Sequence, residues 1–144
     1  MTTIINENSA SCLKVDTDKN ILYIIPKKIE YCNKRLFYEF IDYIVKFWDL
    51  AKANNMKYHI VLDLTKSEIP DLPPLSYYHH IKNKFNSLSP IFETNLHSTG
   101  VLCYKNGKAK MMLGLIFFFY KPTRPIRITE KEDEMVNFMQ NNLL

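Results

Sequence analysis

Glycine is scarce in this chain of 144 residues, which contains only Gly100, Gly107 and Gly114. Phosphate-binding loops gather several glycines between a strand and a helix, so that backbone N–H groups can come close to a phosphate. No such cluster follows an apolar run in this sequence. We therefore expect no phosphate-binding loop, and no other pattern in the sequence indicates a cofactor.

Cysteine is also rare, and the three cysteines, Cys12, Cys32 and Cys103, stand at unrelated spacings. An odd number without a repeating pattern argues against a disulfide framework and favours reduced thiols in an intracellular protein. None of them belongs to a paired metal-binding motif. Cys103 lies in an apolar run, where a free cysteine behaves as a small core residue.

The chain has little arginine and no long apolar run. Its net charge of +4 comes almost wholly from lysine, with only Arg35, Arg124 and Arg127, whereas nucleic-acid-binding surfaces are usually denser in arginine. The longest apolar run, Met111–Tyr120, is about half the length that spans a bilayer. Residues 1–11 also lack a basic segment followed by an apolar core. We therefore expect a soluble, cytoplasmic protein with no nucleic-acid partner and no transmembrane segment.

The apolar residues that are present centre on Lys57–Leu64, which is typical of the central strand of a sheet. By the two-residue period of a strand, one face carries Tyr58, Ile60, Leu62 and Leu64, and the other carries His59, Val61 and Asp63. Since the second face is only partly polar, we expect helices to cover both sides of this strand.

Other segments can be assigned in order along the chain. Residues 1–10 are small and polar, so we expect a flexible N-terminus. A β-hairpin follows from Ser11 to Ile25, with its turn at Asp16–Asn20. A long amphipathic helix is predicted over Lys34–Ala53, because Asn33 is a good cap and apolar residues recur every three or four positions.

The second half of the sequence predicts three further helices and two strands. A helix over Leu75–Leu88 should end at Pro90, because proline disrupts a helix interior. The remaining segments are a strand Val101–Tyr104, a helix Lys108–Tyr120, a strand Ile126–Ile128 and a final helix Glu130–Leu143 capped by Thr129. The turn Lys105–Gly107 joins the first two of these.

Strands that alternate with helices imply an α/β fold. We expect a mixed, mostly parallel sheet with an opening β-hairpin and about four helices, forming one domain over residues 11–144. Strand Lys57–Leu64 should lie in the interior, between Ile21–Ile25 and Val101–Tyr104.

This layout, with Asp63-Leu64-Thr65 closing the central strand, resembles the STAS domains of anti-anti-sigma factors. Residues 117–128, FFFYKPTRPIRI, are similar to a pattern of the related CRAL-TRIO lipid-binding domains. The STAS resemblance implies a phosphorylatable serine at the start of the next helix, but the matching stretch Pro70–Leu75 contains none. We therefore expect no phosphorylation switch at the start of that helix, and the nearby Thr65 and Ser67 remain the possible switch hydroxyls.

Histidines are the only candidates for catalysis or metal binding. His79 and His80 are adjacent on a predicted helix and point about 100° apart, which disfavours a shared metal ion against an i, i+4 pair. His59 and Asp63 share a strand face but are too far apart for contact, and His97 could approach from the next strand. With no nucleophile motif beside them, we expect no metal site and no catalytic site.

The run Met111–Tyr120 is apolar on more than one face. Some of its side chains must meet something besides the sheet, either a neighbouring helix or a partner protein. We therefore mark Leu113, Phe117, Phe118 and Tyr120 as a candidate interaction surface, with a homodimer as the favoured form.

The sequence thus favours a non-enzymatic, STAS-like protein-interaction, scaffold or regulatory module without the phosphorylatable serine motif. The alternative is a small lipid- or hydrophobe-binding domain of the CRAL-TRIO-like type. An apolar cavity would favour the alternative, and a convergent cleft of His59, Asp63 and His97 would favour an enzyme.

Overall fold

The computed structural model describes residues 1–28, 33–105 and 107–144. Cys32, predicted to be a reduced thiol, and Asn106 of the predicted turn lie outside these ranges. The remaining cysteines, Cys12 and Cys103, are buried free thiols.

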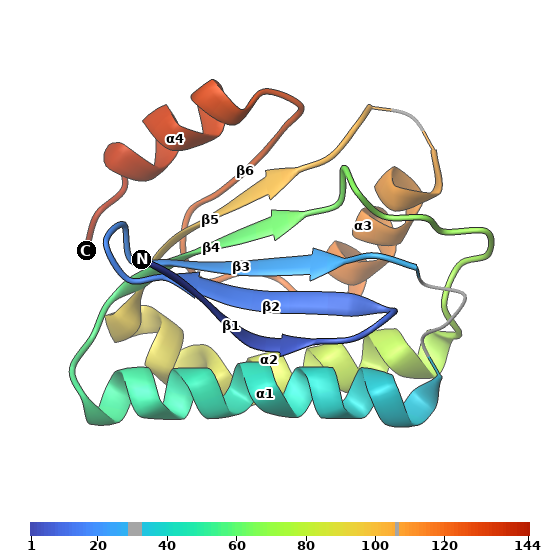
Figure 1. The fold of residues 1–144 in the computed structure, drawn as a ribbon, viewed down its shortest axis with the longest axis horizontal. Coiled ribbons are helices and arrows are strands. Elements are labelled where there is room, and N and C mark those ends of the chain that lie inside the picture. The colour runs from blue at the N-terminus through green and yellow to red at the C-terminus, as the bar shows by residue number, and fades with distance from the viewer. Residues whose placement is uncertain (29–32, 106) are drawn as a thin grey trace.

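The fold is a six-stranded mixed sheet with helices on both faces (Figure 1). Its strands are β1 Thr2–Glu7, β2 Ser11–Asp16, β3 Ile21–Pro26, β4 Tyr58–Asp63, β5 Leu96–Leu102 and β6 Ile126–Thr129. The first three pair antiparallel, and β3 to β6 pair in parallel. The α/β class, the largely parallel sheet and the interior position of β4 between β3 and β5 are therefore confirmed.

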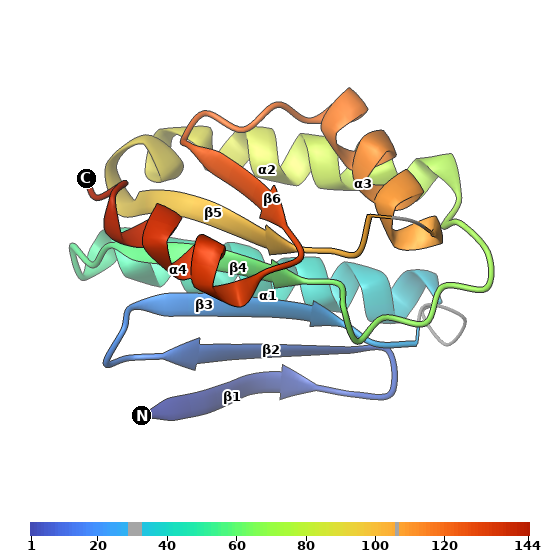
Figure 2. The same ribbon diagram turned by 90° about the horizontal axis from the view of Figure 1, so that it is seen from above.

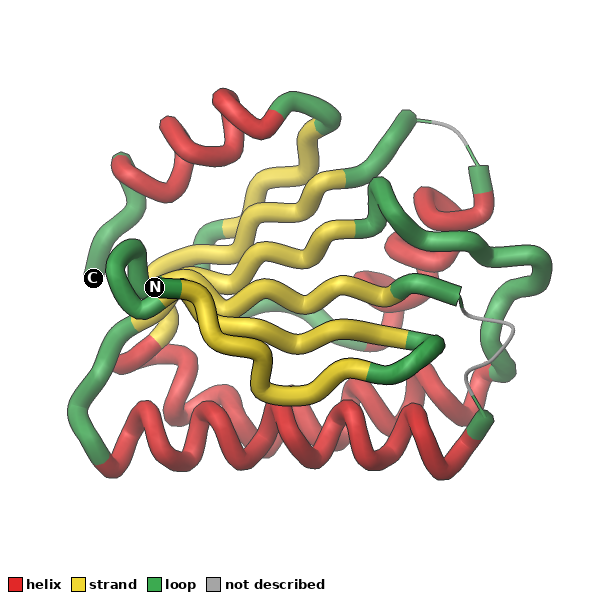
Figure 3. The backbone as a smooth tube through the Cα atoms, in the orientation of Figure 1, coloured by secondary structure: helices red, strands yellow, loops and turns green. Residues whose placement is uncertain are grey.

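The helices are α1 Lys34–Ala53, α2 Leu75–Asn95, α3 Lys108–Phe119 and α4 Glu132–Gln140. Figure 2 shows α4 on one face of the sheet, with α1, α2 and α3 on the other. The tube in Figure 3 shows how the strongly twisted strands lie between these two helical layers. A helical crossover joins each successive pair of parallel strands, as a parallel sheet requires.

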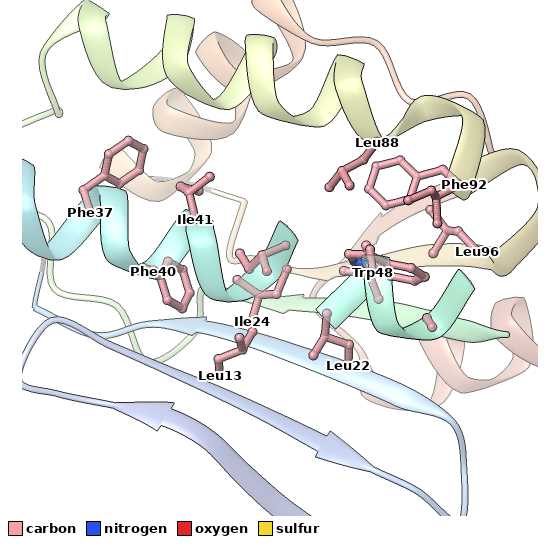
Figure 4. Packing of buried hydrophobic residues seen from close by; sticks show 14 residues of the cluster. Leu13, Leu22, Ile24, Phe37, Phe40, Ile41, Trp48, Leu88, Phe92 and Leu96 are labelled. Carbon is pink, nitrogen blue, oxygen red and sulfur yellow. The ribbon is translucent and has the colours of Figure 1, made fainter. Parts of the chain in front are cut away.

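The long helix α1 forms where the sequence predicts it. The Asn33 side chain accepts a hydrogen bond of 2.9 Å from the Leu36 N–H, which satisfies one of the free donors of the first turn. Its apolar stripe is buried against the sheet and α2: Phe37, Phe40, Ile41, Ile44, Trp48 and Ala51. In Figure 4 the ring of Trp48 lies beside that of Phe92 from α2, above Leu22 of β3.

The expectation of a flexible N-terminus is wrong, because Thr2–Glu7 forms the edge strand β1. It pairs antiparallel with β2 in a register that is interrupted between Ile4 and Asn6. The segment has few apolar residues because most of β1 is exposed at the sheet edge. Its backbone hydrogen bonds to β2 hold it in place, and these leave no trace in the hydrophobic pattern.

The second helix does not end at Pro90. It continues to Asn95, with Pro90 inside it. Proline removes one helical N–H donor, but Ile91 and Phe92, directly after it, are buried in the core with Leu88. Burying these side chains contributes roughly 1.5–3 kcal/mol each, which is comparable to the cost of the proline.

Two further boundaries differ from the predictions. Strand β5 starts at Leu96, directly after α2, so His97–Gly100 belongs to the sheet rather than to a loop. Helix α4 starts at Glu132, because Thr129 still pairs with Leu102 as the last residue of β6. The Thr129 hydroxyl accepts from the Lys131 N–H at 3.1 Å and donates to Glu134 at 2.8 Å, so it fixes the turn before the helix.

Helix α4 packs closely on β5 at Gly100. A Cβ atom at this position would lie 2.8 Å from the Met135 sulfur of α4. Met135 and Met139 complete a small buried cluster with Ile21, Val61 and Leu102 on this face of the sheet. The glycine therefore sets the distance between α4 and the sheet.

Candidate functional site

An apolar cavity of about 160 Å³ lies between the sheet and the three helices α1, α2 and α3. It is the feature of the fold that best matches a binding site, since such sites are concave and mainly apolar. No charged side chain is among the described residues that line it. A comparable apolar cavity of about 150 Å³ is known to bind benzene.

The walls of the cavity come from segments far apart in the chain. The strands contribute Ile24, Ile60, Leu62, Val101 and Ile126, on the sheet face under α1, α2 and α3, and Leu64 follows directly after β4. The helices contribute mainly aromatic and branched side chains: Phe37, Ile41, Tyr78, Phe85, Phe92, Ile116 and Phe117. Phe85, Ile81, Ile116 and Phe117 are only half-buried. The wall is therefore thinnest between α2 and α3.

Hydroxyl groups are the main polar feature of the lining. Tyr78 on α2 and Tyr120 at the end of α3 both line the cavity and are buried. Burial raises the pKa of Tyr78 and raises the pKa of Tyr120 to about 12, because a phenolate would lose its hydration. Both phenols stay neutral at physiological pH and can only take part in neutral hydrogen bonds.

The residues marked as an interaction surface separate into buried and exposed groups. Leu113 and Tyr120 are buried, with 1% and 6% of their surface exposed. Tyr120 makes an edge-to-face contact with Phe85 of α2, with ring centroids 5.5 Å apart. Phe117 is half-buried and lines the cavity, whereas Phe118 is 76% exposed. The neighbouring helix α2 thus covers much of the second apolar face of α3.

The two candidate switch hydroxyls hold the loop after β4. The Thr65 hydroxyl and the Thr65 N–H both donate to Asp63 Oδ1, at 2.6 and 3.0 Å. The Ser67 hydroxyl donates to the Pro26 carbonyl at 2.6 Å and ties this loop to the end of β3. The Asp63-Leu64-Thr65 signature is therefore a local turn, in which the Asp63 side chain accepts the hydrogen bond of a backbone N–H group. The lack of a phosphorylation switch stays a prediction.

The structure brings His59 and His97 together, with ring centroids 4.7 Å apart. A register shift between β4 and β5 sets both His97 and Ser98 opposite His59, and His59 Nδ1 lies 2.8 Å from Ser98 Oγ. Burial and the nearby His97 lower the pKa of His59 to about 4. Asp63 is at the other end of β4, bonded to Thr65, so these groups do not form a hydrolytic triad.

The adjacent histidines of α2 point to different neighbours. The His79 ring lies 4.6 Å from that of Phe119 on α3, and the His80 ring stacks on Tyr38 of α1 at 4.0 Å. Within the described ranges, no group of three potential ligands could hold a metal ion. In the same ranges, no helix has both the length and the apolar character needed to cross a bilayer.

The cavity could not be located from the sequence. Each lining residue is an apolar residue on the inner face of its own element, which is also the pattern of a fully packed core. The aromatic content of α1, α2 and α3 is the only sequence feature that bears on it, since aromatic rings are common in ligand pockets.

No family model, no curated protein and no solved structure matches the chain.

Proposed function

We propose that this chain is a non-enzymatic binding module that holds a small apolar molecule in the cavity between its sheet and α1, α2 and α3. The observation that carries the proposal is the cavity itself, about 160 Å³ in volume and lined almost wholly by apolar side chains. The cavity supports the hypothesis of a hydrophobe-binding domain more than the hypothesis of a scaffold module. Its volume suits a single aromatic ring rather than a long acyl chain.

Binding of para-xylene, followed by calorimetry or by methyl NMR shifts, tests this function. A ligand of this size gains at most a few tenths to about 1 kcal/mol per heavy atom. We expect saturable binding with a Kd on the order of 0.2 mM, equivalent to about 5 kcal/mol. A native chain that shows no saturable binding up to the solubility limit of the probe would refute the proposal.

A matched pair of variants locates the bound probe. Ile81 lines the cavity from α2 and is half-buried, so Ile81→Phe should fill part of the space and weaken binding at least tenfold. Ile128 on β6 is exposed and lies outside the lining, so Ile128→Phe should leave binding unchanged. Equal effects of the two substitutions would place the probe elsewhere.

A second function, as a STAS-like protein-interaction module, is supported by the exposed side of α3. Met111, Leu115 and Phe118 follow each other at four- and three-residue steps, which puts them on one helical face. We call these three residues the outer stripe of α3. Met111 is 58% exposed, Phe118 is 76% exposed, and Leu115 is half-buried. Exposed apolar stripes of this kind mark association surfaces.

We propose that the outer stripe binds a second copy of the chain. Gly114 lies between Met111 and Leu115, and a Cβ atom there would meet no atom within 4 Å. A small residue inside an apolar stripe lets another helix approach closely, and two-fold pairing would bury both stripes together.

Sedimentation at micromolar concentration tests this second function. We expect a dimer that Phe118→Asp dissociates. Leu50→Asp, at an exposed apolar position of α1, is the control and should leave the dimer intact. A native chain that sediments as a monomer at all concentrations, or equal effects of both variants, would exclude association through α3.

A further inference from the structure

Tyr78 combines deep burial with an unsatisfied polar group. The residue is only 2% exposed and packs on α2 against Leu64, Val101 and Met112. Its hydroxyl oxygen is buried and has no hydrogen-bond partner among the described residues. Tyr78 also lines the apolar cavity.

An unpaired buried hydroxyl is unusual in a folded protein, because buried polar groups nearly always have a partner. Phenylalanine would fill nearly the same volume at this position without a polar group. Leaving the tyrosine hydroxyl unpaired costs the desolvation of that group, and no hydrogen bond to the described residues offsets this cost. Because Tyr78 lines the cavity, a ligand with one polar group would supply the missing partner.

We propose that the Tyr78 hydroxyl recognises the polar end of the ligand, which is a neutral molecule of about one aromatic ring that carries a hydroxyl or carbonyl group. This inference rests on the proposed function of the cavity and specifies its ligand class. The ring would occupy the apolar space beside Phe85 and Ile116, and the single polar group would bond to Tyr78.

The electrostatics of the cavity agree with a neutral ligand. The described lining has no charged side chain to offset the dehydration of an ion. Because burial raises the pKa of Tyr78, its hydroxyl stays protonated and can either donate to a ligand oxygen or accept from a ligand hydroxyl.

Two isosteric probes test the inference. Para-cresol and para-xylene have nearly the same shape and differ in one group, a hydroxyl against a methyl. Kd values for both probes are measured on the native chain and on Tyr78→Phe. We expect the ratio of the para-cresol Kd to the para-xylene Kd to rise about tenfold in the variant, which is the size of one buried hydrogen bond. Unchanged para-xylene binding confirms that Tyr78→Phe keeps the fold.

Tyr43→Phe is the matched control, because Tyr43 is an exposed tyrosine of α1 outside the cavity lining. It should leave the ratio unchanged. If para-xylene binds but the ratio is the same in the native chain and in Tyr78→Phe, the role of Tyr78 is refuted and the cavity function stands. If neither probe binds the native chain, both proposals fail.

Discussion

His59 of β4 and Ser98 of β5 are both buried and share a hydrogen bond of 2.8 Å between the imidazole Nδ1 and the hydroxyl oxygen. The His97 ring lies against the other histidine, and the Leu144 N–H donates to His97 Nδ1 at 2.8 Å. A proton on His59 would be buried beside a second titratable ring. The pair therefore links the stability of the sheet to pH.

The first prediction concerns acid stability. The pKa of His59 is about 4 in the folded protein against 6.5 for the unfolded chain, so the unfolded chain binds the proton first. The free energy of unfolding should fall as the pH drops from about 6.5 to about 4, by on the order of 3 kcal/mol from this group. Denaturant unfolding of the native chain and of His59→Gln across this range measures it.

His59→Gln should lose most of this pH dependence, while the smaller contributions of His80 and His97, whose pKa values are also lowered, remain. Parallel curves for the two proteins between pH 4 and 6.5 would show that His59 is not the responsible group.

The second prediction concerns the contact between α4 and β5. Gly100→Ala should destabilise the fold by about 1–3 kcal/mol, because the new methyl group would overlap the Met135 side chain. Gly114→Ala is the control. It lies in α3 with open space around it, and alanine favours a helix over glycine by about 0.5–1 kcal/mol. Unfolding measured at a concentration where the chain is monomeric should move the two variants in opposite directions.

The third prediction concerns Asn95, a buried amide at the end of α2. Its Nδ2 donates to the Met56 carbonyl at 2.7 Å, in the connection between α1 and β4. Asn95→Ala should cost about 1–3 kcal/mol, because it leaves this carbonyl without its partner. Thr94→Ala, which removes an exposed neighbour that donates to Asn95, should cost much less. A similar loss in both variants would contradict a special role for Asn95.

The fourth prediction concerns the hydroxyl of Tyr78 in the absence of any ligand. Because that hydroxyl has no partner among the described residues, Tyr78→Phe should be as stable as the native chain or more stable by up to about 1 kcal/mol. A thermal or denaturant unfolding curve gives the answer. Clear destabilisation would mean that the hydroxyl has a partner in solution.

Local sequence signals predicted most of the fold, and non-local contacts account for the errors. Helix α1 was predictable because Asn33 and the apolar period act within the helix itself. The sequence does not predict strand β1, because the pairing of β1 with β2 depends on backbone groups. It predicts that α2 ends at Pro90, because Ile91 and Phe92 become buried only in the folded chain.

Only some contacts of the candidate site could be predicted from the sequence. The nearness of His59 and His97 follows from adjacent strands, but the register shift that adds Ser98 does not show in the pattern. The cavity depends on how side chains of α1, α2 and α3 fill the space above the sheet. Tyr78 has the same sequence appearance whether its hydroxyl is bonded or not, so only the packed structure identifies it.

The strands stand in the sheet in the same order as in the chain, from β1 to β6. Each strand therefore pairs with the strand made just before it, although each parallel pair must wait for a helical crossover, as between Ile21 and His59. The antiparallel pairs β1–β2 and β2–β3 close short loops, whereas the parallel pairs close longer ones, whose entropy cost grows only slowly with length. We expect the sheet to assemble strand by strand while the chain is still leaving the ribosome, with α4 closing the second face last.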